Sequence, residues 1–280
     1  MNPNKWSRKR RRGILQPGEN ECIMAEQIRN QPLKLKLPPI VEAVVDIDCD
    51  LPPDRPLSKI EEEATASLRE SYPKVEKKFI KQVQFGIGEQ STHKFKEGIA
   101  AFLFRREDGR QLTQFRNGGY SFNRLAPYDG LDTYLPEIKH TWENYKTIAL
   151  PKTVRKISLR TINRIPLPLD QKGSLKLGEY LQTDPRLPQI DGRTLSFTGF
   201  VHRHQIRDEK SGQEAHLVLA SQDHQEGKMN LLLDISAFDR SMISLDPQDW
   251  DVIESTIQSL RRLKNDLFAN ILTQKCLDQF

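Results

Sequence analysis

The sequence predicts an α+β protein built from a duplicated β-α-β-β-β-α unit, with antiparallel or mixed sheets and helices packed on one face. Three observations carry this prediction. Segments rich in β-branched residues alternate apolar and polar positions, as half-buried strands do. A long segment near the C-terminus repeats apolar residues at helical spacing, and the two halves of the chain show the same order of elements.

The first predicted unit covers residues 31–150. A β-branched strand at 39–48 is followed by a helix that runs from Ser58, which forms a capping box with Glu61, to Tyr72. The expected elements after it are strands at 79–87, 99–106, 111–116 and 120–124 and a helix at 132–147. The dipeptide Asp108-Gly109 supplies the positive φ angles of a tight turn and therefore predicts a hairpin.

The second predicted unit covers residues 151–280. Its expected elements are strands at 154–165, 195–206, 214–221 and 229–235, with Pro166 ending the first strand, and a short helix at 175–181. The last helix begins with Asp246 as N-cap and Pro247 at its first position, and its apolar stripe consists of Ile253, Ile257, Leu260, Leu263, Leu267 and Ile271. No Gly/Ser-rich linker lies near Leu150, so we expect one compact body. A chance similarity of element order is the alternative to a duplication.

The N-terminal residues 1–30 have the composition of a disordered basic arm. The whole chain has a formal charge of +5, of which +4 belongs to residues 1–23, so the rest of the chain carries only +1. We therefore expect no nucleic-acid partner except through the basic arm at residues 5–12. A start at Met24, with residues 1–23 untranslated, is the alternative explanation of this segment.

Composition excludes several classes of protein. The 280 residues are 36% hydrophobic and form no window of about 20 apolar residues, the length that a membrane span needs. The three cysteines form no Cys-x-x-Cys pair, which favours reduced structural thiols over a disulfide framework. We expect a cytoplasmic protein without a cofactor.

A histidine group in the second unit is the candidate metal site. If Arg207 pairs with Gln213, His204 lies opposite His216, and His202 shares their face. A second register, with Ser221 opposite Met229, brings Asp234 beside His216. The four side chains, His202, His204, His216 and Asp234, would suit zinc or ferrous iron. The alternative, which the sequence favours, is a solvated sheet face with no metal.

Arginines near the predicted strand 154–165 form the candidate ligand site. Arg155, Arg160, Asn163 and Arg164 follow one another along this strand. Arg160, Asn163 and Arg164, together with Arg124 at the corresponding place in the first unit, form the candidate set. Guanidinium groups suit phosphate or carboxylate, so these four residues would line an anion-binding cleft between the units. The alternative, which the sequence favours, is that the arginines form structural pairs with carboxylates such as Asp46, Asp48 or Asp129.

The remaining motifs give no catalytic residues. The sequence contains no P-loop and no nucleophile elbow, and Gly86-x-Gly88 precedes no helix and reads as the end of a strand. Phe115, Tyr120 and Phe122 alternate with arginines, as in surfaces that stack single-stranded bases, but packing of the two phenylalanines in the core is the favoured interpretation.

Several segments resemble a sporadically distributed bacterial protein family of unknown function. They are Leu37-Pro-Pro-Ile-Val-Glu-Ala-Val-Val-Asp46, Tyr120-Ser-Phe-Asn-Arg-Leu-Ala-Pro-Tyr-Asp129, Trp142-x-x-Tyr145, Ile157-Ser-Leu-Arg-Thr-Ile-Asn-Arg-Ile165, Leu232-Leu-Asp-Ile235 and the last helix to Lys275. The resemblance covers residues 33–280 and implies a gene of the mobile, defence-associated or toxin–antitoxin type.

These observations predict an interaction protein that binds another protein, as an accessory factor in defence or in a toxin–antitoxin pair. The sequence favours this function over an enzyme. The competing hypothesis is a domain that binds a small anionic ligand in a cleft between the two units. A metal-dependent enzyme built on the histidine group ranks third.

Overall fold

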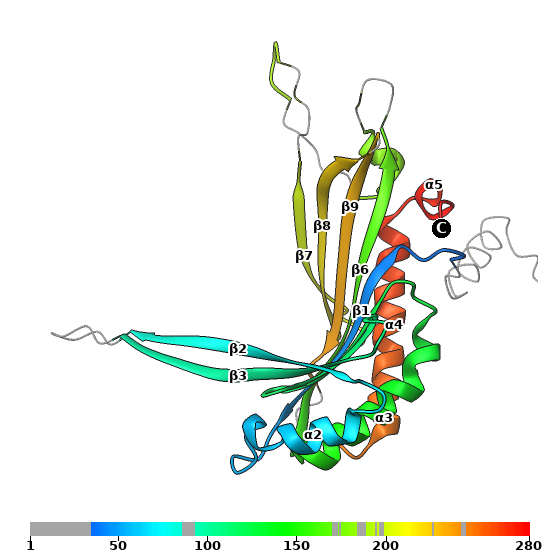
Figure 1. Cartoon of the computed structure of the whole chain (residues 1–280). Coiled ribbons are helices and arrows are strands. Elements are labelled where there is room, and N and C mark those ends of the chain that lie inside the picture. Colours follow the sequence, from blue (N-terminus) through cyan, green and yellow to red (C-terminus); the bar gives the residue numbers. More distant parts are fainter. Residues whose placement is uncertain are drawn as a thin grey trace, which may run out of the picture. The chain divides into compact units, whose positions relative to one another are not determined.

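Strands β1 (Ile40–Asp50) and β6 (Thr153–Pro168) lie side by side at the centre of an antiparallel sheet (Figure 1). The computed structural model describes residues 35–280 apart from 86–92, 170–172, 174, 184–188, 194, 196–198, 226 and 242–244. In these residues the sheet has nine strands in the order β2-β3-β4-β5-β1-β6-β9-β8-β7. The other strands are β2 (Lys74–Phe85), β3 (His93–Arg105), β4 (Gln111–Arg116), β5 (Gly119–Leu125), β7 (Val201–Arg207), β8 (Glu214–Gln225) and β9 (Lys228–Asp239).

The helices of the described residues contribute to one hydrophobic core on one face of this sheet. They are α2 (Glu61–Leu68), α3 (Leu131–Ala149), α4 (Trp250–Ile271) and α5 (Gln274–Leu277), with 3-10 turns η1 (Leu57–Lys59) and η2 (Leu177–Glu179). Helix α4 packs along β6 and β9 (Figure 1). In the apolar stripe predicted for α4, Ile253, Ile257 and Leu260 are fully buried, while Leu263 and Leu267 pack partly buried against the core.

The core is rich in aromatic side chains that come from β4, β5 and α3. Phe115 and Tyr120 are fully buried, and Phe122 is 2% exposed, so the predicted core role of the two phenylalanines is confirmed. Trp142 stacks on Tyr145 at a ring-centroid distance of 5.5 Å and meets Tyr120 edge to face at 5.6 Å. These contacts fix α3 against the sheet, because aromatic pairs add stability beyond the area that they bury.

The α+β class and the antiparallel pairing agree with the sequence prediction, but the duplicated unit is not confirmed. In the described part of the first half, four strands follow helix α2, as the individual strand predictions had it, so this half does not fit the repeated unit with three strands after its helix. In the second half, the place of that helix is taken by the three-residue turn η2. Part of the strand predicted at 195–206 lies outside the described residues, and β7 begins at Val201.

Both predicted helix N-caps and one predicted strand end are wrong. Ser58 lies in the turn η1, and the residue that precedes α2 is Ile60, which provides no side-chain cap. Helix α4 is capped by Asp249, whose side chain accepts a hydrogen bond from the Val252 amide, whereas Asp246 accepts one from the Gln248 amide in the turn before the helix.

The third wrong end is that of β6, which runs through Pro166 to Pro168. The pairing of β6 with β1 stops at Asn163, so beyond this residue β6 has a neighbouring strand only on the β9 side. Proline lacks the N–H that a ladder needs, and it is tolerated where one side of a strand is unpaired. The proline therefore marks a local edge of the sheet and does not end the strand.

The described residues belong to one compact unit, Leu35–Phe280. In this described part of the chain, no helix is long and apolar enough to cross a membrane. The predicted basic arm and Cys22 lie outside the described residues. Cys49 and Cys276 are buried free thiols.

Candidate interaction surface on the open sheet face

Charged and polar side chains gather on the sheet face opposite the helices, at the central strands. We call this surface the open face and define it by ten residues. They are Glu42, Asp46 and Asp48 of β1, Arg116 of β4, Ser121 and Asn123 of β5, Lys156, Ser158 and Arg160 of β6, and Asp234 of β9. These positions alternate along each strand with the buried core residues, because successive side chains of a strand point to opposite faces.

The first row of the open face runs across four strands. Register pairing places Arg116, Gly119, Asp48 and Lys156 in line on β4, β5, β1 and β6. The Asp48 carboxylate accepts from both cations, with 3.0 Å to Arg116 Nη2 and 2.6 Å to Lys156 Nζ. Its side chain is 22% exposed, so this double ion pair is partly shielded from solvent.

Gly119 makes this row possible. Its φ is +141°, and a Cβ at this position would lie 2.1 Å from the Ile47 carbonyl oxygen. No side chain fits between β5 and β1 at this point. The Arg116 guanidinium therefore crosses β5 over bare backbone, and it also donates to the Tyr120 carbonyl at 3.1 Å.

The second row continues the network toward the other end of β1. Ser121 Oγ donates to Asp46 at 2.5 Å, and Arg116 Nη2 lies 3.2 Å from the same carboxylate. Asn123 Nδ2 donates to Glu42 at 2.8 Å. The three acidic side chains that β1 contributes to the open face are thus all engaged by donors from neighbouring strands.

Arg160 and Asp234 form a separate pair on β6 and β9. The guanidinium binds the carboxylate through two hydrogen bonds, Nε at 2.8 Å and Nη2 at 2.6 Å. This bidentate geometry is the strong form of the arginine–carboxylate pair, and the hydrogen bonds to Asp234 raise the pKa of Arg160 above its ordinary value. The Arg160 side chain is 44% exposed, so one side of the pair remains accessible.

The predicted register of the histidine group is wrong by one residue. Arg207 pairs with Glu214, so His216 lies opposite Gln205, and His204 lies opposite Leu217. His216 therefore points to the open-face side, while His202 and His204 occupy alternate positions on the helix side. Asp234 lies opposite Val218. Among the described residues, no group of three or more His, Cys, Asp or Glu side chains is placed to hold a metal ion.

The four residues of the predicted anion cleft lie on two faces of the sheet. Arg124 is on the helix side, where Nε donates to the Tyr134 hydroxyl at 3.0 Å and the guanidinium lies 5.1 Å from the center of that ring. Asn163 is also on the helix side, 1% exposed, and donates to the Leu233 carbonyl at 2.9 Å. Arg160 and Arg164 are on the other face. The structure does not bring these four side chains together.

Structural pairs with Asp46, Asp48 or Asp129 were the predicted alternative for the arginines of this group, and the ion pairs observed for these arginines are with other carboxylates. Arg160 pairs with Asp234, and Arg155 Nε lies 3.3 Å from Asp50. The residue that engages Asp46 and Asp48 is Arg116, which the sequence interpretation missed. The alternation of charged and apolar residues along β1 and β4 indicated which positions share a face, but only the strand order shows that these positions meet.

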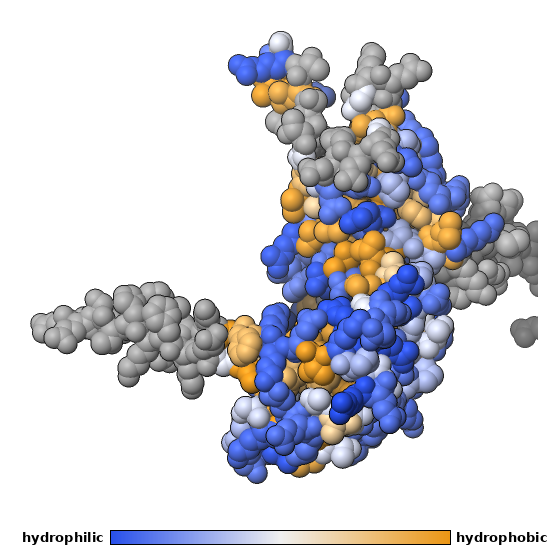
Figure 2. Space-filling view, viewed as in Figure 1, coloured by the Kyte–Doolittle hydropathy of each residue, from blue (hydrophilic) through white to orange (hydrophobic). Residues whose placement is uncertain are grey.

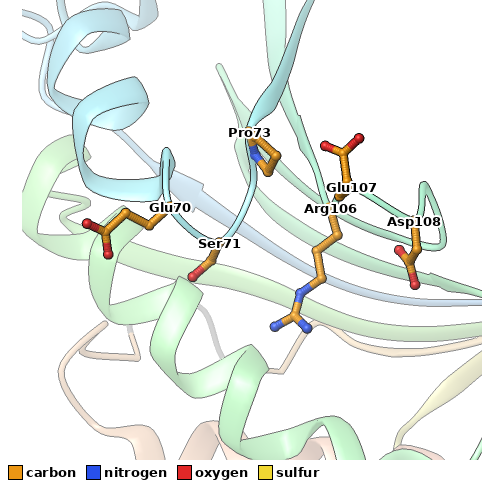
Figure 3. A pocket seen from close by; sticks show the side chains of 6 residues that line it. All are labelled: Glu70, Ser71, Pro73, Arg106, Glu107 and Asp108. Carbon is orange, nitrogen blue, oxygen red and sulfur yellow. The ribbon is translucent and has the colours of Figure 1, made fainter.

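A pocket lies between the end of α2 and the β3–β4 turn (Figure 3), lined by Glu70, Ser71, Pro73, Arg106, Glu107 and Asp108. Arg106 is held there by Glu137, at 3.0 Å, and lies over the ring of Tyr72. The Tyr72 hydroxyl donates to Glu137 at 2.6 Å, and burial raises its pKa. These contacts lock the turn to α3 and leave the pocket with a mixture of charges that favours no one ligand class.

The surface in Figure 2 shows hydrophobic residues in patches that are separated by hydrophilic ones. A scan against protein-family models found no match to this chain, and a search of the curated proteins found none either.

Proposed function

We propose that the protein is an interaction protein that recognises another protein through the open face. The observation that carries this proposal is the set of ion pairs of alternating sign on the central strands β4, β1, β6 and β9. The resemblance of the sequence to a sporadically distributed bacterial family supports a cytoplasmic accessory role in defence or in a toxin–antitoxin pair.

The geometry suits selective binding because the charges are already fixed. Arg116 and Arg160 are each held by one or two carboxylates, so a partner that meets them does not have to order a flexible side chain. Complementary charge patterns contribute specificity and association rate more than affinity. A partner surface with the opposite order of charges would fit this face, and one with the same order would be repelled.

A small anion is a weaker candidate ligand. The donor fork of Arg160 is already occupied by Asp234, and an incoming phosphate would have to displace this carboxylate. Arg124, which would have to contribute from the other half, is on the opposite side of the sheet. The predicted cleft lay between the two halves of an internal duplication. We keep this duplication as a proposal about how the chain arose, and binding of a protein to the open face does not depend on it.

The test compares protein capture by three forms of the full chain in cells that express it naturally. The double variant Arg160→Gln/Asp234→Asn removes both charges of the pair and keeps the hydrogen-bonding shape. The matched control, Arg261→Gln/Asp132→Asn, removes an ion pair of 2.7 Å that links α4 to α3 on the helix side. We expect one protein to be recovered in stoichiometric amount with wild type and control, and not with Arg160→Gln/Asp234→Asn. Equal recovery with all three forms, or no stoichiometric protein with wild type, would overturn the proposal.

A further inference from the structure

The hairpin β2–β3 extends beyond the sheet as a two-stranded ribbon. Strand β4 pairs with β3 only across Ala101–Arg105, whereas β2 pairs with β3 along its whole length. In the strand ladders, residues 79–85 and 93–99 therefore pair only with each other, and in Figure 1 strands β2 and β3 leave the sheet together. An isolated two-stranded ribbon is marginally stable in water. Its length adds little to the stability of the fold, which suggests that it serves in binding.

The ribbon is strongly basic in an otherwise acidic body. Its paired segments, 74–85 and 93–99, contain six lysines and two glutamates, a net charge of +4. Since the chain after residue 23 carries +1 in total, everything in that part of the chain outside these two segments, including Glu89 between them in the sequence, sums to −3. The positive charge of the folded chain is therefore concentrated on this hairpin, and a polyanion is the partner that such a concentration attracts.

Register divides the ribbon into two kinds of residue pair. Gln82 pairs with Lys96, and Gln84 pairs with Lys94, at alternate positions without an acidic residue. Lysine and glutamine are the residue types that contact phosphates and hydrogen-bond to base edges in the major groove of DNA. The alternate parity carries Phe79 opposite Ile99, Lys81 opposite Glu97 and Val83 opposite Phe95, so it combines apolar pairs with one pair of opposite charge.

The base of the ribbon is exposed. Phe79 and Ile80 are 55% and 46% exposed. In Figure 2, hydrophobic atoms are visible on the surface where the coloured body meets the grey part. Two lysines at the base are engaged in ion pairs, Lys74 with Glu107 and Lys77 with Glu61. Lys78 is exposed and has no ion pair among the described residues.

Edge pairing with a second copy is disfavoured by the same lysines. Strand β2 is the outer strand of the sheet, and its sequence places a lysine at positions 74, 77, 78 and 81. Lysines on an edge strand discourage strand-to-strand association, because two such edges repel each other. The positive charge of the β2 lysines therefore disfavours pairing with a second copy of this chain and favours binding of an anionic partner.

We propose that the β2–β3 ribbon binds double-stranded DNA in the major groove. The groove of B-form DNA admits a two-stranded β-ribbon, while the narrow major groove of double-stranded RNA does not. Seven residues of strand span roughly 23 Å, enough to follow the groove past several phosphates. This site is separate from the open face and does not depend on it.

The experiment measures binding of full-length protein to a fluorescein-labelled DNA duplex of about 30 base pairs by fluorescence anisotropy. The affinity is measured at about 50 and about 200 mM KCl, because the change of affinity with salt reports the number of phosphate contacts. The ribbon variant carries Lys78→Gln, Lys81→Gln, Lys94→Gln and Lys96→Gln. The control carries Lys59→Gln, Lys152→Gln, Lys210→Gln and Lys228→Gln, four exposed lysines elsewhere. Both variants lose the same total charge, so a difference between them reports position.

We expect the ribbon variant to bind roughly a hundredfold more weakly than the control and with a shallower salt dependence, since each lost phosphate contact removes one released counterion. A second variant replaces residues 80–98 by Asn-Gly, which keeps Phe79 opposite Ile99, and should lose binding while its melting temperature stays within a few degrees of wild type. No binding by wild type at low salt, equal binding by the two lysine variants, or equal affinity for polyglutamate of the same charge would overturn the proposal.

Discussion

The guanidinium of Arg116 on β4 meets the carboxylate of Asp48 on β1 at 3.0 Å, although β5 lies between these two strands. Gly119 is the residue of β5 that lies in line with them. The contact therefore depends on a position without a side chain. It connects the two neighbours of β5 through their side chains on the open face, in addition to the backbone ladders.

Substitution Gly119→Ala should destabilise the fold by about 3 kcal/mol or more, because a Cβ would collide with backbone and the φ angle is unfavourable for an L residue. Chemical denaturation measures this free energy. The matched control is Gly118→Ala, where the nearest atom to a Cβ is 3.9 Å away, an ordinary contact. Equal losses for the two variants would contradict the close approach of β5 and β1.

Lys264 of α4 is a buried cation that should reduce stability at neutral pH. Its side chain is within the protein at 9% exposure, and burial, together with the nearby charge of Arg261, lowers its pKa to about 8. At pH 7 the amine is protonated in both folded and unfolded chains, so the cost of burying its charge is fully present. Replacement by methionine, Lys264→Met, should therefore raise the free energy of unfolding by about 2 kcal/mol at this pH.

The same residue predicts the direction of a pH effect. Between about pH 8 and the ordinary lysine value, the folded chain releases the Lys264 proton while the unfolded chain keeps it. Stability contributed by this residue therefore rises with pH in this window. The gap in melting temperature between Lys264→Met and wild type should narrow from pH 7 to pH 10. A gap that stays constant would show that Lys264 is not buried as a destabilised cation.

The two buried thiols should be unreactive in the folded protein. Burial raises the pKa of Cys49 and of Cys276 to about 11 each, and thiolate is the reactive form. In a Cys22→Ser background, we expect no labelling by a thiol-specific disulfide reagent at pH 8 and two labelled thiols after denaturation. Fast labelling of the folded chain would indicate that one of these sites opens.

The Arg160–Asp234 pair should contribute little to stability. Its arginine is 44% exposed, and ion pairs with this much solvent contact are worth about 1 kcal/mol or less. The variant Arg160→Gln/Asp234→Asn should accordingly unfold within about 1 kcal/mol of wild type in denaturant titrations. A larger loss would mean that the pair holds β6 to β9 and would disqualify the variant as a probe of binding.

Local patterns in the sequence were enough to predict the elements whose neighbours are close in the chain. The stripe of α4 and the hairpin at Asp108-Gly109 follow from helical spacing and turn chemistry alone. The open face required more, because Asp48 and Lys156 are more than a hundred residues apart in the chain, and their meeting depends on the order β5-β1-β6.

The histidine group shows how sensitive a register is. The turn before β8 aligns Arg207 with Glu214 and not with Gln213, and this single residue moves His216 to the other face. The alternation of apolar residues in β7 was too weak to fix the pairing, since this edge strand buries none of its residues completely. The geometry of the turn between β7 and β8 determines this register, and it could not be predicted from a single sequence.

The central claim is that the open face is the surface that a protein partner recognises. The direct measurement is the affinity of the purified partner for three forms of the full chain by isothermal titration calorimetry. We predict at least a tenfold weaker affinity for Arg160→Gln/Asp234→Asn and no change for Arg261→Gln/Asp132→Asn, in line with the cost of losing complementary charges at an interface. An affinity for Arg160→Gln/Asp234→Asn equal to that of wild type would contradict the claim.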